Sequence, residues 1–283
     1  MKPAPFAYHR ARDVDGATRL LAELGEDAKV VAGGQSLVAM MNFRLARPRH
    51  LVDVGGLREL DRLHTDAAGG LHIGALTTHH TVERDPAGVL GAGFAVLRDA
   101  MAWVGHLPIR TRGTVGGSIA HADATAEWCL LALALDAEFV AHGPRGERRI
   151  AAGDFFLGHY MNALEFDEIL VEIVFPRPAP HAALTEFAQR RGDFALVSAA
   201  VDLEVGDAGE VRGGRVALGG VAASVVRVPE AEAVLAGGGS FAACAAAAAE
   251  AVDPPGDANG STQYRKELVR NLVQDACEEA MKR

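Results

Sequence analysis

The sequence predicts an α+β fold whose pattern changes at a proline-rich stretch, residues 176–180. Before this stretch, short apolar segments typical of strands alternate with short helical segments. After it, two alternating segments typical of a hairpin precede three helical segments. The 283 residues are enough for two or three compact domains, and 49% of them are hydrophobic. The proline-rich stretch is therefore the best candidate for a domain boundary.

The elements before this boundary follow from local signals. A first amphipathic helix is expected over residues 15–24, where Asp15 can cap the start and Gly25 ends the helix. Short apolar strands are predicted at residues 29–32, 51–54, 71–75, 138–141 and 169–175. Further helices are predicted at residues 93–105 and 124–135, whereas residues 37–45 form either a short helix or an irregular segment. The residues Gly143-Pro144-Arg145-Gly146 signal a turn.

The elements after the boundary are more regular. Residues 196–205 and 211–221 alternate in polarity and predict an antiparallel hairpin joined at residues 206–209. Three helices are expected over residues 229–235, 241–251 and 261–281. Ser261 is a suitable cap for the last of them.

Composition excludes several classes of function. The net charge is −9 and no block of Lys and Arg stands out, which argues against nucleic acid as a partner. No run of 18 apolar residues exists and the N-terminus lacks an apolar stretch, so neither a transmembrane helix nor a signal peptide is expected.

The cysteines bear on compartment and on metal binding. Cys129, Cys244 and Cys277 are few and scattered, which argues against a disulfide framework and fits a reducing cytoplasm. They cannot hold an iron–sulfur cluster that needs four cysteines of this chain. If the chain handles electrons, the metal centres must lie on other subunits.

Two glycine-rich strings carry most of the functional signal: Ala32-Gly33-Gly34-Gln35-Ser36-Leu37 and Thr114-Val115-Gly116-Gly117-Ser118-Ile119-Ala120. Adjacent glycines allow close backbone approach, and successive backbone N–H groups can form an anion site. Each string alone is more often a tight turn between packed elements. The first string is neither a Rossmann fingerprint nor a P-loop. Two such strings in one chain, with hydroxyl and amide side chains in them, favour a dinucleotide, and we expect FAD.

Other polar residues have ordinary structural explanations. For His79-His80, a capped surface helix is favoured over a metal site, because no Cys or carboxylate neighbour supports metal binding. Asp123 and Glu127 share a helical face, but a cap and a solvated charge fit better than a catalytic pair.

The two arginines before the second string, Arg110 and Arg112, have two equally open roles. They could neutralise phosphate or contact a partner, or they could be ordinary surface residues. Cys129 lies in an apolar helix and is expected to be buried and inert.

The order of these motifs resembles a known family. The two strings, together with Ile73-Gly74-Ala75, residues 109–113 and Asp123, are similar to the FAD-binding medium subunits of molybdenum hydroxylases, of the aerobic carbon monoxide dehydrogenase type above all. Residues 155–158, 168–173 and 190–195 match the same pattern. The likeness covers nearly the whole chain, and the ordered series is specific although each piece is not.

The resemblance implies a fold and a set of site residues. It implies a vanillyl-oxidase-type (PCMH-type) FAD-binding domain at residues 1–176, in two subdomains of about residues 1–55 and 56–176, and a small α+β C-terminal domain at residues 181–283. Asp123 would contact the adenosine part, Leu170 a ring of the cofactor, and Phe194 the flavin. The FAD diphosphate would be clasped by Ala32, Gly33, Gly34, Gln35, Ser36, Leu37, Thr114, Gly116, Gly117 and Ser118.

The same resemblance implies partners and an electron-transfer function. A small subunit would carry two 2Fe–2S clusters and a large subunit a molybdopterin centre, in a heterotrimer that symmetry doubles. This chain would pass electrons through FAD to an external acceptor, with no catalytic side chain and no metal ligand of its own. A stand-alone FAD-dependent oxidoreductase and a non-catalytic assembly module remain alternatives. The sequence leaves the substrate and the acceptor open.

Overall fold

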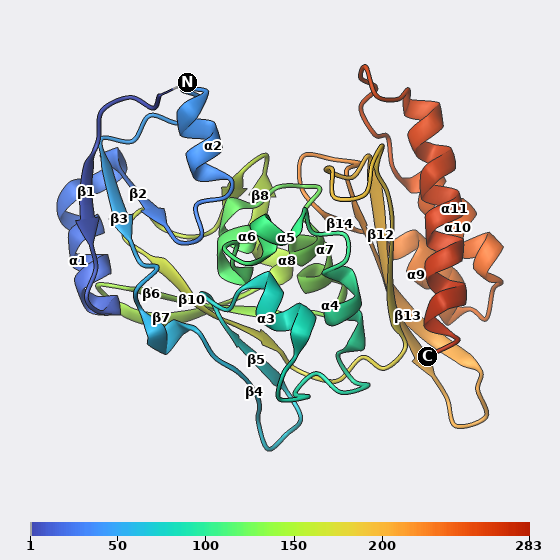
Figure 1. Cartoon of the computed structure of the whole chain (residues 1–283). Helices are drawn as coiled ribbons and strands as arrows, with labels where there is room; N and C mark the ends of the chain where they lie inside the picture. Colours follow the sequence, from blue (N-terminus) through green and yellow to red (C-terminus); the bar gives the residue numbers. More distant parts are fainter. Residues whose placement is uncertain (1) are drawn as a thin grey trace.

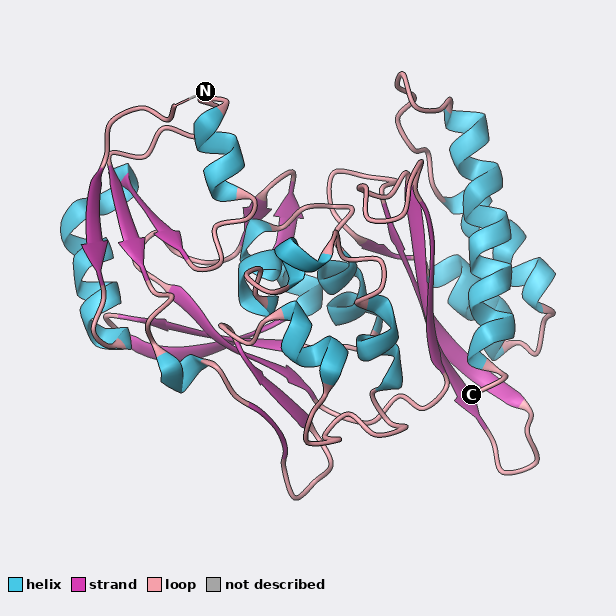
Figure 2. Ribbon diagram, in the orientation of Figure 1, coloured by secondary structure: helices cyan, strands magenta, loops and turns pink. Residues whose placement is uncertain are grey.

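The computed structural model describes residues 2–283, which form three main sheets with helices packed between and outside them (Figures 1 and 2). The first sheet has three parallel strands in the order β1-β3-β2. Its strands are β1 (Ala7–Arg10), β2 (Ala28–Val31) and β3 (His50–Asp53). Helix α1 (Val14–Leu24) connects β1 to β2 and packs between this sheet and the next, since its Ala17 and Leu21 share a core with Val52, Val140 and Val171.

The second sheet has five strands in the order β4-β5-β10-β6-β7, and its pairs are antiparallel. All seven residues of its central strand β10 are buried, because the sheet is covered on both faces. The strands are β4 (Leu63–Thr65), β5 (Leu71–Gly74), β6 (Glu138–Gly143), β7 (Gly146–Ala151) and β10 (Ile169–Phe175). A two-stranded ribbon, β8 (Phe156–Gly158) with β9 (Met161–Asn162), forms a separate small sheet.

Short helices cover one face of the second sheet and separate it from the third (Figure 1). They are α3 (His79–Arg84), α4 (Ala95–Ala100), α5 (Leu107–Arg110), α6 (Val115–His121), α7 (Glu127–Ala134) and α8 (Ala152–Phe155), while α2 (Leu37–Asn42) lies apart, near the first sheet. Residues 128–134 of α7 are all buried, and α7 contacts both β12 and β13. A helix that is apolar on every side is stable only when it is enclosed in this way.

The third sheet has the order β11-β12-β13-β14, with antiparallel pairs. Its strands are β11 (Ala182–Phe187), β12 (Val197–Val205), β13 (Val211–Gly219) and β14 (Val226–Arg227), followed by α9 (Pro229–Ala236), α10 (Phe241–Ala251) and α11 (Thr262–Ala280). Ala182 and Leu184 face the core around α7, whereas Ala183 and Val197 face the C-terminal helices. The third sheet therefore has an apolar side chain layer on each face.

The structure confirms the elements with the strongest local signals. Strand β10 and helix α10 have the predicted bounds, the β12–β13 hairpin forms, and Ser261 caps α11 by accepting a hydrogen bond from the N–H of Tyr264 at 3.1 Å. The predicted cap of α1 is wrong, because Asp13, not Asp15, accepts from the N–H of Gly16 at 2.6 Å.

Other elements differ from the prediction. The helix expected over residues 93–105 shortens to α4, and the loop before the second string contains α5. Several elements were not predicted: strands β1, β4, β7, β8, β9, β11 and β14, helices α6 and α8, and two 3-10 turns at Gly25–Asp27 and Arg58–Leu60. None of the helices found in residues 2–283 combines the length and the apolar character needed to cross a membrane.

Candidate functional site

The first glycine string is a tight turn that leaves β2 and enters α2. Gly34 has a φ of +71°, a backbone conformation that favours glycine. Within residues 2–283, the five successive backbone N–H groups of residues 33–37 donate no hydrogen bond. Successive unpaired N–H groups in a turn form a concave site for an anion. This turn therefore has the donor set that the diphosphate of a dinucleotide needs.

The second glycine string has a different character, because it forms the start of α6. Thr114 caps this helix and its Oγ1 accepts from the N–H of Gly117 at 3.1 Å. The N–H of Val115 donates to the carbonyl of Thr77 at 2.9 Å, and that of Gly116 to the carbonyl of Ala75 at 3.0 Å. The backbone N–H groups of residues 115–118 are thus already paired with the chain. The string is held firmly against the segment that follows β5, and it offers an outer face to a ligand rather than free N–H groups.

The two strings, which are far apart in the chain, are brought together at one place. A Cβ placed on Gly33 would lie 2.0 Å from the carbonyl oxygen of Arg112 and 2.9 Å from Cα of Gly113, directly before the second string. These distances are too short for any side chain, so Gly33 is required for the approach of the two backbones. The first string is in this way brought next to the residues that directly precede the second.

Gly116 and Gly117 have separate tasks. A Cβ on Gly116 would lie 2.5 Å from Cβ of Ala75, so this glycine lets α6 pack against the end of β5. Gly117 is exposed, and a Cβ there would meet only the Thr114 side chain, with the hydroxyl at 2.7 Å. Ser118, next to it, is half-buried. Of Gly116, Gly117 and Ser118, only Gly117 and Ser118 are accessible from outside.

The remaining predicted residues lie on three elements. Asp123 follows α6 and accepts from the N–H and the Oγ1 of Thr125, at 2.9 and 2.8 Å. Its carboxylate is the largest cause of the raised pKa of the Tyr160 hydroxyl. Leu170 is buried in β10, within the core that contains α7. Phe194 is 76% exposed, on the loop between β11 and β12.

The loop that carries Phe194 reaches back towards the second string. A Cβ on Gly192 would lie 2.7 Å from the imidazole of His106 and 3.0 Å from the carbonyl of Gly105. The Nε of Arg191 donates to the carbonyl of Ala102 at 3.3 Å. The loop that carries this exposed aromatic residue is therefore held against the residues that lead into the second string.

His79 supports the second string from behind. It is buried, which contradicts the surface position expected for it, and its Nδ1 accepts from Nε1 of Trp128 at 2.9 Å. Burial, with a smaller effect of the Arg110 charge, lowers the pKa of His79 to about 4. Its backbone N–H donates to the carbonyl of Gly113 at 3.1 Å. A tryptophan buried in an apolar helix needs an acceptor for its indole N–H. Trp128 was therefore the sequence signal that could have indicated a buried histidine.

Arg110 holds the loop before the second string through hydrogen bonds to other protein groups. Its guanidinium donates to Glu83 at 3.0 and 3.1 Å and to the carbonyls of Val104 and Gly105.

Glu127 is not the solvated charge that was expected, since burial raises its pKa to about 7. Cys129 is buried as predicted, and burial raises the pKa of its thiol well above the usual value.

Comparison with known proteins identifies the family. Residues 4–178 match the family model described as FAD binding domain in molybdopterin dehydrogenase, and residues 182–280 match that of the CO dehydrogenase flavoprotein C-terminal domain. The chain is 38% identical to the 6-hydroxypseudooxynicotine dehydrogenase complex subunit alpha of Paenarthrobacter nicotinovorans, covering 100% of this chain and 97% of the relative. It is 34% identical to the carbon monoxide dehydrogenase medium chain of Hydrogenophaga pseudoflava, covering 100% and 99%.

Solved structures agree over the whole length. Carbon monoxide dehydrogenase from Hydrogenophaga pseudoflava matches with a TM-score of 0.94 at 35% identity, covering 100% of this chain and 99% of the other. Quinoline 2-oxidoreductase from Pseudomonas putida 86 matches with a TM-score of 0.93 at 36% identity and the same coverage. The predicted α+β fold is therefore confirmed, and the chain belongs to the family of FAD-binding medium subunits of molybdenum hydroxylases, together with the carbon monoxide dehydrogenase medium chain.

Proposed function

We propose that the chain relays electrons within a molybdenum-containing hydroxylase or dehydrogenase, from iron–sulfur clusters on a partner subunit through FAD to an external acceptor. The observation that carries this proposal is the run of five unpaired N–H groups at residues 33–37, in a chain whose family model is an FAD-binding domain. FAD, when bound, supplies reversible redox chemistry that can link two-electron and one-electron partners. The chain's own task is to bind and orient the cofactor.

The site residues have distinct proposed tasks. The backbone of residues 33–37 receives the diphosphate, and the second string, with its outward Gly117 and Ser118, closes over it. Asp123 contacts the adenosine part, Leu170 lies against a ring, and Phe194 covers the flavin from its loop. The burial of Leu170 and the 76% exposure of Phe194 support this division, because one lines a packed wall and the other is free to contact a ligand.

We propose a large molybdopterin subunit and a small 2Fe–2S subunit as partners, in a dimer of heterotrimers. The names of the relatives, which are medium chains and complex subunits, support an assembly of this kind. The exposed apolar side chains Val38, Phe43 and Leu45, on and after α2, fit a surface that a partner covers.

We place this assembly in the cytoplasm. The three cysteines are free thiols, which fits a reducing compartment.

We also propose that the chain divides functionally at the proline-rich stretch, into residues 1–176 and 181–283. The first part would bind the nucleotide, and the second would contribute the Phe194 loop.

Two measurements test the electron-relay function. In the native complex, molybdenum and iron should co-purify with this chain, and three different chains should elute in equal amounts. Under anaerobic conditions, substrate should bleach the flavin of the complex, whereas the separated chain with FAD should be bleached by dithionite and not by substrate. Bleaching of the separated chain by substrate would favour a stand-alone flavoenzyme. The substrate is chosen by the molybdenum subunit and does not enter this proposal.

A further inference from the structure

A buried arginine at the start of α11 joins three separate segments of the chain. Only 7% of Arg265 is exposed, and its Nη1 donates to the carbonyl of Leu196 at 2.6 Å and to that of Gly220 at 3.2 Å. Its Nη2 donates to Oδ2 of Asp257 at 2.8 Å. Because a guanidinium is planar and its donors have a fixed geometry, these bonds also fix the three acceptors relative to one another.

Stability alone does not require a cation at this position. The side chain of Asp257, which neutralises Arg265, is 49% exposed, and among residues 2–283 no group accepts a hydrogen bond from Nε of the arginine. Removing a cation from water costs free energy, and apolar residues of similar volume often replace buried ion pairs without loss of stability. The specific contribution of this arginine is therefore the connection between the segments that it contacts.

The first of these segments ends the loop of residues 188–196, the Phe194 loop. The N–H of Leu196 donates to the carbonyl of Phe187 at 2.8 Å, and this bond closes the loop at its base. The carbonyl of Leu196, two positions after Phe194, accepts from Arg265. Phe194 itself is 76% exposed and has little packing of its own. Its position therefore depends on how the backbone of the loop is held.

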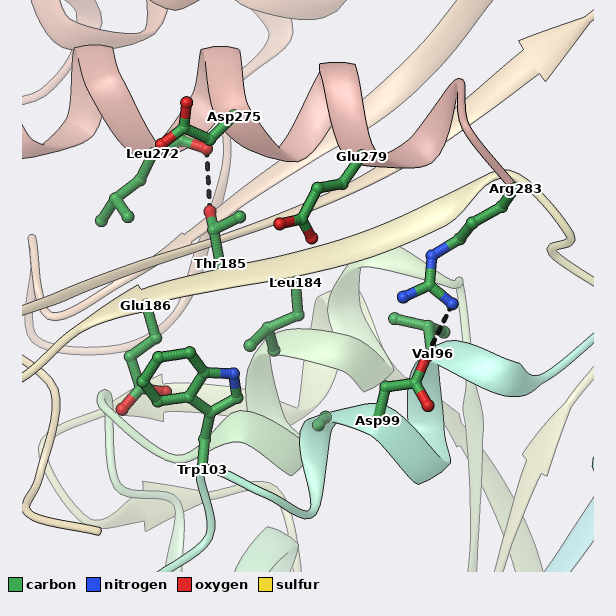
Figure 3. Close-up of a pocket in the computed structure, with 11 residues that line it drawn as sticks. Val96, Asp99, Trp103, Leu184, Thr185, Glu186, Leu272, Asp275, Glu279 and Arg283 are labelled. Carbon is green, nitrogen blue, oxygen red and sulfur yellow. Dashed lines mark hydrogen bonds and ion pairs between the residues drawn. The ribbon is translucent and has the colours of Figure 1, made fainter. Parts of the chain in front are cut away.

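Helix α11 and the residues before it also hold the start of the loop. Thr185 of β11 donates to a backbone carbonyl of α11 at 2.8 Å, and Figure 3 shows Glu186 and Trp103 on the opposite side of the strand. Nε2 of Gln189, in the loop, donates to Oδ1 of Asn259 at 3.0 Å. Both ends of the Phe194 loop are thus attached to the same C-terminal element.

The second segment bonded by the arginine leads to Asp123. A Cβ on Gly220 would lie 2.5 Å from the carbonyl oxygen of Leu196, so the two backbones approach closely at this point. The N–H of Gly220 donates to the carbonyl of Ala124 at 2.9 Å. Nη1 of Arg265 therefore lies where the end of the Phe194 loop meets a residue that is bonded directly beside Asp123.

We propose that Arg265 is a positioning residue for FAD, whose guanidinium holds the Phe194 loop in place relative to the segment that carries Asp123. The inference rests on the proposed contacts of Phe194 with the flavin and of Asp123 with the adenosine part. These contacts lie at the two ends of the cofactor, so one buried cation would set their separation. The tip of the loop keeps its own bond from Arg191 to the carbonyl of Ala102, so loss of the guanidinium should loosen the loop without releasing it.

Limited trypsin digestion of the full chain, with and without FAD, tests the hold on the loop, because Arg190 is an exposed residue of that loop. Arg265→Met removes the guanidinium and keeps an apolar stem. Cleavage after Arg190, identified by mass spectrometry, should become at least about tenfold faster without FAD, since cleavage follows the population of the locally open form. Cleavage after Arg212, at the other end of the β12–β13 hairpin, should not change, whereas a general loss of stability would accelerate both.

FAD binding tests whether the arginine acts through the loop. Arg265→Met and Phe194→Ala should each weaken FAD binding about tenfold and reduce the visible circular dichroism of the bound flavin, because the site is less well preorganised. In the double variant the loss should be well below the roughly hundredfold that independent effects would give. Arg265→Lys should not restore the binding, since a lysine offers a point charge in place of the planar fork.

Arg270→Met is the matched control, because Arg270 lies on the same helix and its guanidinium pairs with Glu267 and Glu250 instead of the loop. It should leave both trypsin cleavage and FAD affinity unchanged. If Arg265→Met does not fold, Asp257→Asn provides a milder test through an exposed carboxylate, and the same direction of change is expected.

Three results would overturn the inference alone, in a chain that binds FAD normally. They are equal cleavage after Arg190 in Arg265→Met and the unmodified chain, independent losses in the double variant, and full restoration by Arg265→Lys. An unmodified chain that does not bind FAD would overturn the proposed function and this inference with it. Faster cleavage confined to the loop, together with coupled losses of FAD affinity, would support it.

Discussion

The indole N–H of Trp128 donates to Nδ1 of His79 across 2.9 Å, and both side chains are buried. Because an indole N–H can only donate, Nδ1 of His79 carries no proton and the ring is neutral with its proton on Nε2. His79 also lies against Gly113, whose added Cβ would be 2.8 Å from the imidazole. This pair therefore links the core helix α7 to the loop that positions the second glycine string.

We predict that His79→Ala lowers the free energy of unfolding by about 2–4 kcal/mol, because it leaves the Trp128 N–H unpaired and opens a cavity. The pH dependence follows from the lowered pKa of His79, about 4 in the folded chain against 6.5 ordinarily. The folded state disfavours the charged ring, so its stability is complete above pH 6.5 and is lost as pH falls towards 4. The free energy of unfolding, measured by chemical denaturation at several pH values in this range, should change less with pH in the variant than in the unmodified chain. An equal change with pH would contradict the assignment.

We predict that Gly33→Ala reduces FAD retention from stoichiometric to a minor fraction and destabilises the chain by about 1–3 kcal/mol. The reason is that the new Cβ overlaps the backbone carbonyl of Arg112, which cannot move aside as a side chain could. Flavin absorbance after desalting measures retention. Gly153→Ala is the control, since Gly153 has open space around its Cβ position and no positive φ. Full flavin content in Gly33→Ala would contradict the contact between the strings.

Gly116→Val and Gly117→Ala separate packing from ligand binding. The first places a branched side chain against Ala75 and should lower both the melting temperature and flavin content. The second disturbs only the Thr114 hydroxyl and the outward surface, so it should weaken FAD binding with a stability loss of no more than about 1 kcal/mol. Thermal unfolding and flavin titration distinguish the two. If Gly117→Ala binds FAD normally, the second string has no direct contact with the cofactor.

We predict that Glu186→Gln stabilises the chain at high pH. The pKa of Glu186 rises from 4.5 to about 8 on folding, so its contribution to stability is complete below pH 4.5 and declines as pH rises through 8. A neutral amide removes this decline, and the gain at pH 8 should be about 1 kcal/mol or more. Denaturant titrations at pH 5 and 8 measure it. A variant that loses stability equally at both pH values would show that the carboxyl group is not the cause.

Features that depend on neighbouring residues could be predicted from the sequence alone. The cap at Ser261, the turn at residues 143–146 and the β12–β13 hairpin are specified within a few positions, because caps and turns use local hydrogen bonds and allowed dihedral angles. The ordered motifs were also sufficient to identify the family and its cofactor. Residues that belong to a linear pattern, such as Ala32 to Leu37, could be named as site candidates for the same reason.

Which distant residues meet was settled by tertiary packing. Strand β1 exists because Ala7 and the residues after it pair with β3, from His50 onwards, and a four-residue segment has no stable strand structure alone. The contact of Gly33 with Arg112, the burial of His79 beneath Trp128, and the unpaired Glu186 are likewise products of packing. Their energies arise from burial and from backbone approach across the fold, which no local pattern records. For this reason the sequence located the glycine strings, whereas the structure showed that one of them presents free N–H groups and the other supports it.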